Sequence, residues 1–526
     1  MHQSLSDSVM KTTAAITRMN SDFYIDDITW NDLSMDKVCE IIDRSGSSVG
    51  SEYLRKMLRT CLTNEEPLRK RSERVDQLQK DPGLLSSFQK IYKDLGKTKK
   101  ISLYDYIFRF NEIKEAGNIP HYLMIILLLA SIGLIFLNPV AGIIALVVMF
   151  VINISTYFRY KAHIEAYFMC FKYIVRMLKA ASKITKILSK SSTPFDELNE
   201  RLCEDQEKLA SLKRGSWLLT NSVSGSLTDV IMDYVRMLFH VDIIKFNNMR
   251  KCAACEMQTI DELFCTLGEI ESDICICLYR QTLDHWRYPE FVYDSHSENA
   301  PQAHGVRLSF KGLYHPLVED PVRNDMEIAR PVLLTGSNAS GKSTFLKQVA
   351  INQIFAQTIC TCLADEYKTG FYKVMSSMAL SDNILGKESY FIVEIKSLKR
   401  IFDEAENSSP CRDHVPVMCF IDEVLRGTNT KERVAASSQI LKNLSERNIL
   451  CFAATHDIEL THLLNDCMDN YHFREYVNGN DIEFDYKIKP GPASSRNAIR
   501  LMQAYGFDPS IINAANALAD TGTSDL

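Results

Sequence analysis

A run of small and polar residues between positions 335 and 344 could bind phosphate. It reads TGSNASGKST and fits the spacing G-x-x-x-x-G-K-[ST]. The glycines let backbone N–H groups face phosphate oxygens, while Lys342 could reach the β- and γ-phosphates and Ser343 could hold Mg²⁺. The predicted binding residues for a nucleoside triphosphate are Gly336, Ser337, Asn338, Ala339, Ser340, Gly341, Lys342, Ser343 and Thr344.

Three polar residues farther along the chain could hydrolyse a bound nucleotide. Asp422 and Glu423 follow the apolar run 417–421, and His456 comes just after a second apolar run at 449–454. We expect Asp422 to orient Mg²⁺ through its water shell and Glu423 to polarise the attacking water as general base. His456 would point at the γ-phosphate from the end of a neighbouring strand. With Lys342 these residues form the predicted catalytic set, although each alone would more simply be a solvated polar group.

The elements that must position these residues alternate between strand and helix. An apolar β-type run at 332–334 leads into the phosphate loop, and a helix-compatible run at 343–356 leads out of it. From about residue 296 onward, β-type runs alternate with helical ones, which is typical of an α/β sheet. Residues 21–115 and 161–295 have helical patterns. The predicted fold class is therefore α + α/β, with a helical first part followed by an α/β domain.

The bulk composition is that of an ordinary globular chain. Its 526 residues carry a net charge of −6, which excludes a globally basic nucleic-acid surface but not a local basic patch. The 15 cysteines are scattered and odd in number, as is typical of reduced cytosolic thiols. Residues 1–20 are polar, lack the pattern of a signal peptide and are predicted to be disordered.

An uncharged stretch in the middle of the chain predicts a membrane hairpin. No Asp, Glu, Lys or Arg occurs within 116–158, and Asn138-Pro139 divides this stretch into apolar runs at 121–137 and 140–158. Both runs can cross a bilayer, and the basic residues on both flanks place the two ends in the cytoplasm. A buried hairpin in a soluble core is the alternative, but neither run has a polar face. We therefore expect a multi-pass cell-membrane protein with a hairpin at 116–160 and a cytoplasmic nucleotide domain.

Several sequence blocks resemble the ATPase domain of the MutS family of DNA mismatch repair proteins. They are TGSNASGKSTFLKQ at 335–348, SYFIVEI at 389–395, FIDEVLRGTNTKE at 420–432, FAATHDIEL at 452–460 and GPASSRNAIRLMQAYGFDPSIINAA at 491–515. The resemblance covers roughly residues 300–520, and the flanking helical parts are more weakly similar to the family's helical core. It implies a P-loop ATPase domain of the ABC type at 296–526, which takes ATP and Mg²⁺.

The resemblance also implies a homodimer with shared nucleotide sites. Ser389 would then reach the γ-phosphate of the nucleotide held by the partner chain. Arg426 and the residues after it would lie along the dimer interface, and His456 would sense the nucleotide state. The segment 491–519 would be the helical element that secures the dimer.

The chain departs from the family's pattern in ways that bear on function. Few residues of this sequence precede the helical core, so we expect no mismatch-reading domain with its Phe-x-Glu wedge and no connector domain. Ser337 and Ala339-Ser340 stand where mismatch-repair members usually show Pro and Met-Gly. Val322-Arg323 lacks the aromatic residue that usually stacks on adenine. We therefore expect a shortened, membrane-anchored branch that binds ATP without recognising mismatches.

Two functional hypotheses follow. The first is a dimeric, membrane-tethered MutS-like ATPase, for which mismatched or structured DNA stays an open ligand by resemblance. The second is a membrane mechanochemical or transport ATPase, or an ATP-dependent scaffold, with an unidentified membrane or cytosolic protein partner and no DNA role. The Lys-rich segment 172–190 does not decide between them, because its basic face could contact DNA, lipid headgroups or solvent.

Overall fold

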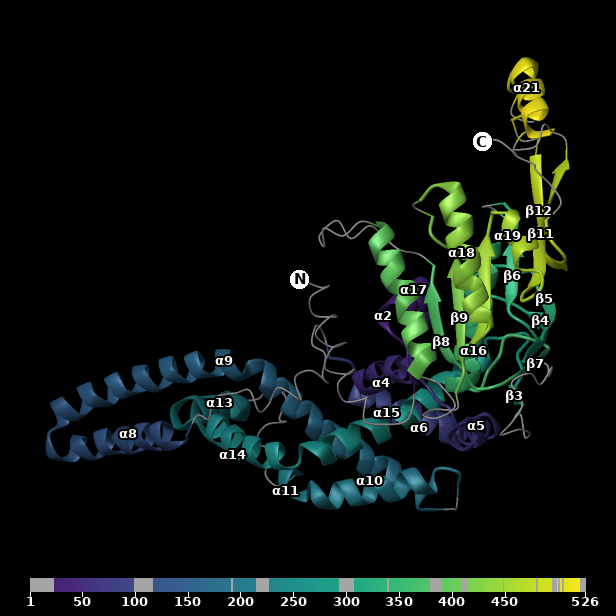
Figure 1. The fold of residues 1–526 in the computed structure, drawn as a ribbon. Coiled ribbons are helices and arrows are strands. Elements are labelled where there is room, and N and C mark those ends of the chain that lie inside the picture. Colours follow the sequence, from purple (N-terminus) through teal and green to yellow (C-terminus); the bar gives the residue numbers. More distant parts are fainter. Residues whose placement is uncertain are drawn as a thin grey trace. The chain divides into compact units, whose positions relative to one another are not determined.

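The computed structural model of the chain contains two compact units (Figure 1). The helical unit comprises residues 43–56 and 73–278, and the sheet unit comprises residues 23–42, 57–72 and the chain from residue 279 onward. The structure describes residues 23–98, 117–190, 193–213, 227–292, 307–337, 340–378, 390–407, 415–426, 428–447, 449–478, 481–493, 499, 502–503 and 506–520.

A six-stranded sheet with the order β12-β11-β6-β10-β9-β8 is the framework of the sheet unit. The pairings β11-β6, β6-β10, β10-β9 and β9-β8 are parallel, whereas β12 is antiparallel to β11. All residues of β6 and β10 are buried, as expected for parallel strands covered on both faces. The strands are β6 (Val332–Thr335), β8 (Lys373–Ser377), β9 (Val417–Asp422), β10 (Ile449–Thr455), β11 (Asp469–Asn478) and β12 (Asp481–Pro490).

Smaller elements complete the sheet unit. A four-stranded sheet has the order β3-β7-β4-β5, and a short antiparallel pair joins β1 to β2. The bounds are β1 (Phe23–Tyr24), β2 (Thr60–Cys61), β3 (Glu290–Phe291), β4 (Leu308–Leu313), β5 (Asn324–Ile328) and β7 (Glu366–Thr369), with helices α2 (Asp27–Asp32), α3 (Met35–Ile42), α19 (Glu459–Leu463) and α21 (Pro509–Asp520).

One face of the large sheet is covered by α17 (Tyr390–Asn407) and α18 (Thr430–Ser445), which Figure 1 shows in front of it. The side chains that form this core alternate along β9 and β10 and meet apolar residues of both helices, because successive strand residues point to opposite faces. The cluster includes Cys419, Ile421, Cys451, Ala453, Leu398, Ile401, Leu441 and Leu444. This packing fixes α17 against the end of β9.

Helix α16 (Lys342–Thr358) is buried along nearly its whole length, although it carries several polar side chains. Its amide groups bind the backbone of surrounding loops. Gln348 donates to the carbonyl oxygen of Leu313 at 2.7 Å, and Gln357 donates to that of Tyr372 at 3.0 Å. Buried polar groups destabilise a fold unless they are hydrogen-bonded, so these contacts fix the rotation of the helix. The first turn of α16 is thereby held at the sheet edge.

The helical unit is centred on α9 (Pro139–Leu188), a single helix of 50 residues. No Pro or Gly occurs within 143–188 to interrupt it. The other helices are α6 (Pro82–Leu95), α8 (Ile119–Leu137), α10 (Asp196–Lys208), α11 (Ala210–Lys213), α13 (Leu227–Phe239) and α14 (Val241–Cys255), with most of α4 (Ser48–Arg59) and α15 (Met257–Arg280) and the second half of α5 (Glu65–Lys80).

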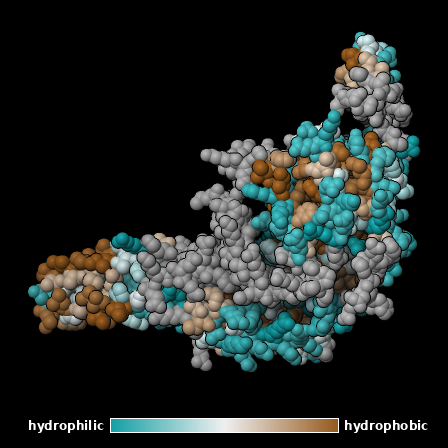
Figure 2. Space-filling view, in the orientation of Figure 1, coloured by the Kyte–Doolittle hydropathy of each residue, from teal (hydrophilic) through white to brown (hydrophobic). Residues whose placement is uncertain are grey.

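Helices α8 and α9 form an antiparallel hairpin whose turn lies at Asn138. The Asn138 side chain accepts the N–H of Ala141 at 3.2 Å, and Pro139 starts the second helix, so Asn-Pro both ends one helix and begins the next. Gly142 allows the two helices to approach closely, because a Cβ atom there would lie 2.4 Å from the backbone nitrogen of Ile135. The hairpin surface is apolar in Figure 2.

The predicted mixture of a helical part and a sheet part is confirmed, and the structure adds two differences from the expected boundaries. The second apolar run, expected at 140–158, is the first part of α9 and not a separate helix. Segments 23–42 and 57–72, expected to belong to the helical part, lie in the sheet unit. For example, the Asp32 carboxylate accepts the Ser376 hydroxyl at 2.6 Å. Residues 1–20, expected to be disordered, and parts of the segment 491–519 lie outside the described residues.

Candidate nucleotide-hydrolysis site

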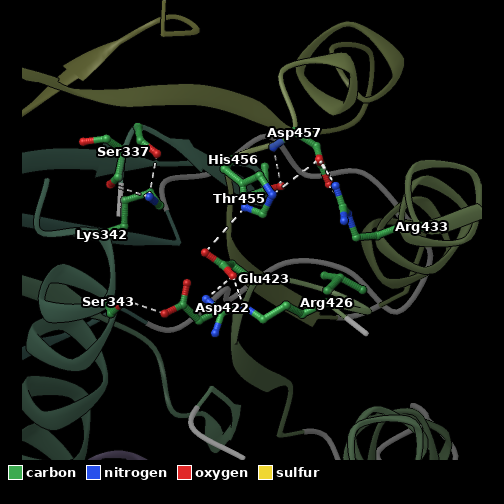
Figure 3. Close-up of polar contacts among 12 residues, drawn as sticks. Ser337, Lys342, Ser343, Asp422, Glu423, Arg426, Arg433, Thr455, His456 and Asp457 are labelled. Carbon is green, nitrogen blue, oxygen red and sulfur yellow. Dashed lines mark hydrogen bonds and ion pairs between the residues drawn. The ribbon is translucent and has the colours of Figure 1, made fainter. Parts of the chain in front are cut away.

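The candidate side chains come from the carboxyl ends of three strands of the large sheet. Because β10 is parallel to both β6 and β9, the three strands end at one edge. The register places Thr455 beside Thr335, and Ala454 beside Asp422. The loop after β6, the acidic pair at the end of β9 and the histidine after β10 therefore meet (Figure 3). Ligands of open α/β sheets bind at this edge.

The described part of the phosphate loop depends on its two glycines. Gly341 has φ of 99° and Gly336 has φ of 149°, a region that other residues rarely adopt. A Cβ atom at Gly336 would lie 2.8 Å from Oγ of Ser340, and one at Gly341 would lie 3.0 Å from the ring of Tyr486. The backbone can thus follow a path that a side chain would block.

Lys342 lies in the first turn of α16 and folds back over the loop. Its Nζ donates to the carbonyl oxygens of Gly336 at 2.6 Å and Ser337 at 2.8 Å. Burial lowers the pKa of Lys342, while the nearby carboxylates Asp422 and Glu423 act in the opposite direction. The ammonium group therefore lies at the mouth of the loop, where it can contact phosphate oxygens.

Ser343 and Asp422 bring two hard oxygen ligands together. The Ser343 hydroxyl donates to Oδ2 of Asp422 at 2.5 Å. Burial raises the pKa of Asp422, the bond from Ser343 lowers it, and the neighbouring Glu423 raises it. Among the described residues, no group of three or more His, Cys, Asp or Glu side chains could hold a metal. Mg²⁺ commonly takes one or two protein oxygens and fills its remaining positions with phosphate and water, so this pair fits it.

Glu423 lies beside Asp422 and is bound by a basic residue of its own turn. The Arg426 guanidinium forms an ion pair with Oε2 of Glu423, and Nδ1 of His456 lies 3.5 Å from Oε1. Burial by itself raises the pKa of Glu423, but the hydrogen bond and charge of Arg426 outweigh it, so the pKa lies below its ordinary value. Glu423 is therefore ionised and able to accept a proton.

His456 lies between two carboxylates. Its Nε2 is 3.7 Å from Oδ1 of Asp457. Arg433 of α18 donates one hydrogen bond to each oxygen of this carboxylate, at 2.6 Å to Oδ1 and 2.9 Å to Oδ2. The N–H of Asp457 donates to Oγ1 of Thr455 at 3.0 Å, which shapes the turn after β10. The imidazole side chain is 43 % exposed, so it can respond to groups that enter the site.

A pocket of about 340 Å³ opens beside the phosphate loop. Its walls combine apolar and polar groups and include three aromatic side chains. They include His315, Asn324, Gly341, Thr344, Phe345, Gln348, Phe473 and Tyr486. A heterocyclic base fits a pocket of this size and lining. Tyr486 is not among the residues predicted from the sequence, where its only signal is an aromatic residue in the β-type run before Gly491.

The structure brings together Lys342, Ser343, Asp422, Glu423 and His456 as expected from the sequence. Ser337 and Ser340 lie in the loop, where Ser337 donates to Glu475 at 2.8 Å and Ser340 donates to the Ser337 carbonyl oxygen at 2.8 Å. Thr344 follows Ser343 on α16 and lines the pocket. The predicted residues Asn338, Ala339 and Ser389 lie outside the described residues.

The sheet unit matches a known family. Residues 332–521, which contain the loop, the acidic pair and His456, match the model of MutS domain V. This part of the chain is similar to domain V of the MutS family. The DNA mismatch repair proteins MutS of Thermus thermophilus and Thermus aquaticus are each 32 % identical to this chain over 219 residues. The MutS of Natronomonas pharaonis is 26 % identical over 285 residues.

These matches cover only parts of both chains. The two Thermus alignments span 41 % of this chain and 26 % of each relative, and the Natronomonas alignment spans 52 % of this chain and 31 % of the relative. The chain thus matches about a quarter to a third of the length of these relatives.

Proposed function

We propose that this chain is a Mg²⁺-dependent ATPase that works as a homodimer and is anchored in a membrane by α8 and α9. The observation that carries the ATPase proposal is the meeting of Lys342, Ser343, Asp422 and Glu423 at one sheet edge. The match to MutS domain V supports the same activity. ATP would place its phosphates on the loop and its base in the pocket next to Gly341.

Each residue then has a separate task in hydrolysis. Lys342 would exchange its bonds to the loop carbonyls for bonds to the β- and γ-phosphates. Ser343 and Asp422 would hold Mg²⁺, which neutralises phosphate charge when it is bound. Glu423 would orient the attacking water and accept its proton. His456, beside Glu423, would contact the γ-phosphate side of the site.

The dimer proposal rests on the family resemblance. In MutS-like dimers each nucleotide site is completed by the partner, and Ser389 is the residue of this chain that would cross to the partner's γ-phosphate. All but the last residue of helix α21 lies within the segment 491–519 that would secure the dimer.

The membrane proposal rests on the hairpin. By length and composition, Ile119–Leu137 and Pro139–Ala162 could each cross a bilayer, and only 17 % of either span is buried within the protein. Core helices of soluble proteins are mostly buried, so this exposure favours lipid as the surroundings. The cell membrane would then hold the hairpin, with the ATPase domain in the cytoplasm.

DNA is a second candidate ligand, because these relatives are DNA mismatch repair proteins. The alternative is a mechanochemical or transport-type ATPase, or a scaffold, that acts on a membrane or cytosolic protein without DNA. A salt titration of binding to mismatched, branched and perfect duplex DNA separates these functions. Binding that weakens steeply with salt supports the DNA role, and no binding at low salt excludes it.

The test of the ATPase proposal is the substitution Glu423→Gln in the detergent-solubilised, full-length protein. Glutamine keeps the size of the side chain but cannot take the proton, so we expect turnover to fall by about 100-fold or more while ATP still binds. Phosphate release and binding of a fluorescent ATP analogue measure the two effects. Exposed Glu446, at the end of α18, gives the control Glu446→Gln. Normal turnover by Glu423→Gln would exclude Glu423 as the base.

A further inference from the structure

The turn that follows β9 has an unusual backbone conformation. Glu423 and Leu425 have φ of 57° and 58°, in the left-handed region that residues other than glycine rarely adopt. Glu423 and Arg426 both extend from this turn, and Leu425 is buried in the core cluster between the sheet and α17. A strained turn keeps its shape only where neighbouring groups hold it. The position of Glu423 therefore depends on those groups.

Glu394 of α17 is such a neighbouring group. Its side chain is 4 % exposed, and its Oε1 accepts the backbone N–H of Leu425 at 2.5 Å. The backbone N–H of Arg426 also donates to this carboxyl group. Successive N–H groups in a turn with left-handed residues form a concave site for an anion, and the Glu394 carboxylate occupies it.

Other contacts hold the two ends of the same turn. The N–H of Glu423 donates to the carbonyl oxygen of Ala454 at 2.9 Å, and the Ser437 hydroxyl donates to the carbonyl oxygen of Val424 at 3.2 Å. These bonds join the turn to β10 and α18, whereas Glu394 joins it to α17. Among the described residues, Oε2 of Glu394 makes no hydrogen bond, so the hydrogen bonds given for this carboxyl group all go to the turn.

We propose that Glu394 is a positioning residue for ATP hydrolysis, whose carboxylate holds the turn after β9 so that Glu423 faces the nucleotide. This role rests on the proposed ATPase function. It also ties the general base to α17, because the helix and the turn then move together. Helix α17 begins at Tyr390, directly after Ser389 in the sequence. A displacement of this helix would displace Glu423 and change kcat more than nucleotide affinity.

The test compares three substitutions of Glu394 in the full-length protein. Glu394→Leu has a similar volume but no acceptor, and we expect kcat to fall by about tenfold or more, since small misplacements of catalytic groups cost this much. KM and the affinity for a fluorescent ATP analogue should stay within about twofold. Glu394→Gln keeps an acceptor oxygen and should restore kcat to within about threefold of the wild type.

Ser397 provides the matched control. It lies one turn farther along α17, is 1 % exposed, and its hydroxyl makes no hydrogen bond among the described residues. Ser397→Ala should leave kcat unchanged. If Glu394→Leu does not fold, Glu394→Asp tests the role of Glu394 instead. This variant withdraws the carboxylate by one methylene and should lower kcat by about threefold or more.

Three results would overturn the role of Glu394. They are an unchanged kcat in folded Glu394→Leu or Glu394→Asp, a parallel loss of affinity and kcat, and an equal loss in Ser397→Ala. Each of them leaves the ATPase proposal standing if the wild type hydrolyses ATP. A wild-type protein without ATPase activity would instead overturn the proposed function, and the role of Glu394 with it.

Discussion

Tyr486 stands over the phosphate loop and supplies an aromatic surface that Val322-Arg323 lacks. The residue is 43 % exposed, and its ring lies close enough to Gly341 that a Cβ atom there would be 3.0 Å from the ring. The Asn324 side chain donates to the Tyr486 carbonyl oxygen at 3.1 Å, which fixes the backbone of β12 beside the pocket. An exposed ring at the edge of a base-sized pocket is placed to stack on the base.

We expect Tyr486→Ala to weaken ATP binding by about tenfold, because stacking of a base on an aromatic ring contributes about 1–2 kcal/mol. Tyr486→Phe keeps the ring and should bind ATP like the wild type. Equilibrium titration with a fluorescent ATP analogue measures both variants. Equal affinity of the alanine variant and the wild type would show that the ring does not contact the base.

The sequence predicts those parts of the site that lie at the ends of strands. The phosphate loop, Asp422-Glu423 and His456 each lie at or directly after the end of a strand, so parallel pairing alone brings them together. Tyr486 could not be found this way, because β12 is placed beside the loop by its antiparallel pairing with β11 and by the bond from Asn324 of β5. Glu394 was missed because its contact with Leu425 depends on how α17 packs on the sheet.

Helix α10 carries a buried acid that makes the stability of the helical unit depend on pH. Asp205 is 3 % exposed, and its Oδ2 has no hydrogen bond in the described chain. Burial raises the pKa of Asp205 to about 6, and the negative charge of Glu262 adds to the shift. The folded state therefore binds a proton that the unfolded state has already released. Stability is lost as pH rises from about 4 to 6.

The substitution Asp205→Asn removes the loss of stability that accompanies ionisation of Asp205, because an amide stays neutral at every pH. We expect the variant to be more stable than the wild type by about 1–3 kcal/mol above pH 7, and to show no such gain at pH 4. Thermal unfolding of the detergent-solubilised protein at both pH values measures the difference. Glu200→Gln, at an exposed position of the same helix, is the control and should not change the melting temperature. A gain of the same size at pH 4 would contradict this explanation.

The arrangement of the helices could be predicted only in part. Helix boundaries depend on local interactions, whereas packing partners depend on contacts between residues far apart in the sequence. Asn138-Pro139 ends α8 by local chemistry alone, since proline cannot continue a helix and asparagine caps the next one. The grouping of 23–42 and 57–72 with the sheet unit depends instead on contacts far apart in sequence. The hydrogen bond between Asp32 and Ser376 is one such contact, and the sequence around either residue does not predict it.

At the scale of the whole molecule, the apolar surface of the hairpin ends at a set of polar contacts within the helical unit, at the end of the hairpin opposite its turn. Tyr157 of α9 donates to Asp242 of α14 at 2.7 Å, and Lys161 donates to the Tyr157 hydroxyl at 2.9 Å. At the start of α8, His121 shares a hydrogen bond with His240 at 2.8 Å. Beyond these polar contacts the hairpin exposes large apolar side chains up to its turn. This arrangement fits a bilayer that surrounds the hairpin from its turn to the polar contacts of Tyr157 and His121.

A charge on the exposed face of the hairpin should therefore hinder its insertion. Leu127 of α8 is 46 % exposed, and a lysine near the middle of a spanning helix costs about 2.5–3.5 kcal/mol. We expect the wild type to stay with membranes in alkaline carbonate, and Leu127→Lys to appear partly in the soluble or aggregated fraction. Leu463→Lys places the same charge at a 58 % exposed leucine of α19 in the sheet unit and should fractionate like the wild type. Recovery of the wild type in the soluble fraction without detergent would contradict the membrane anchor. It would point instead to a protein partner that covers the hairpin.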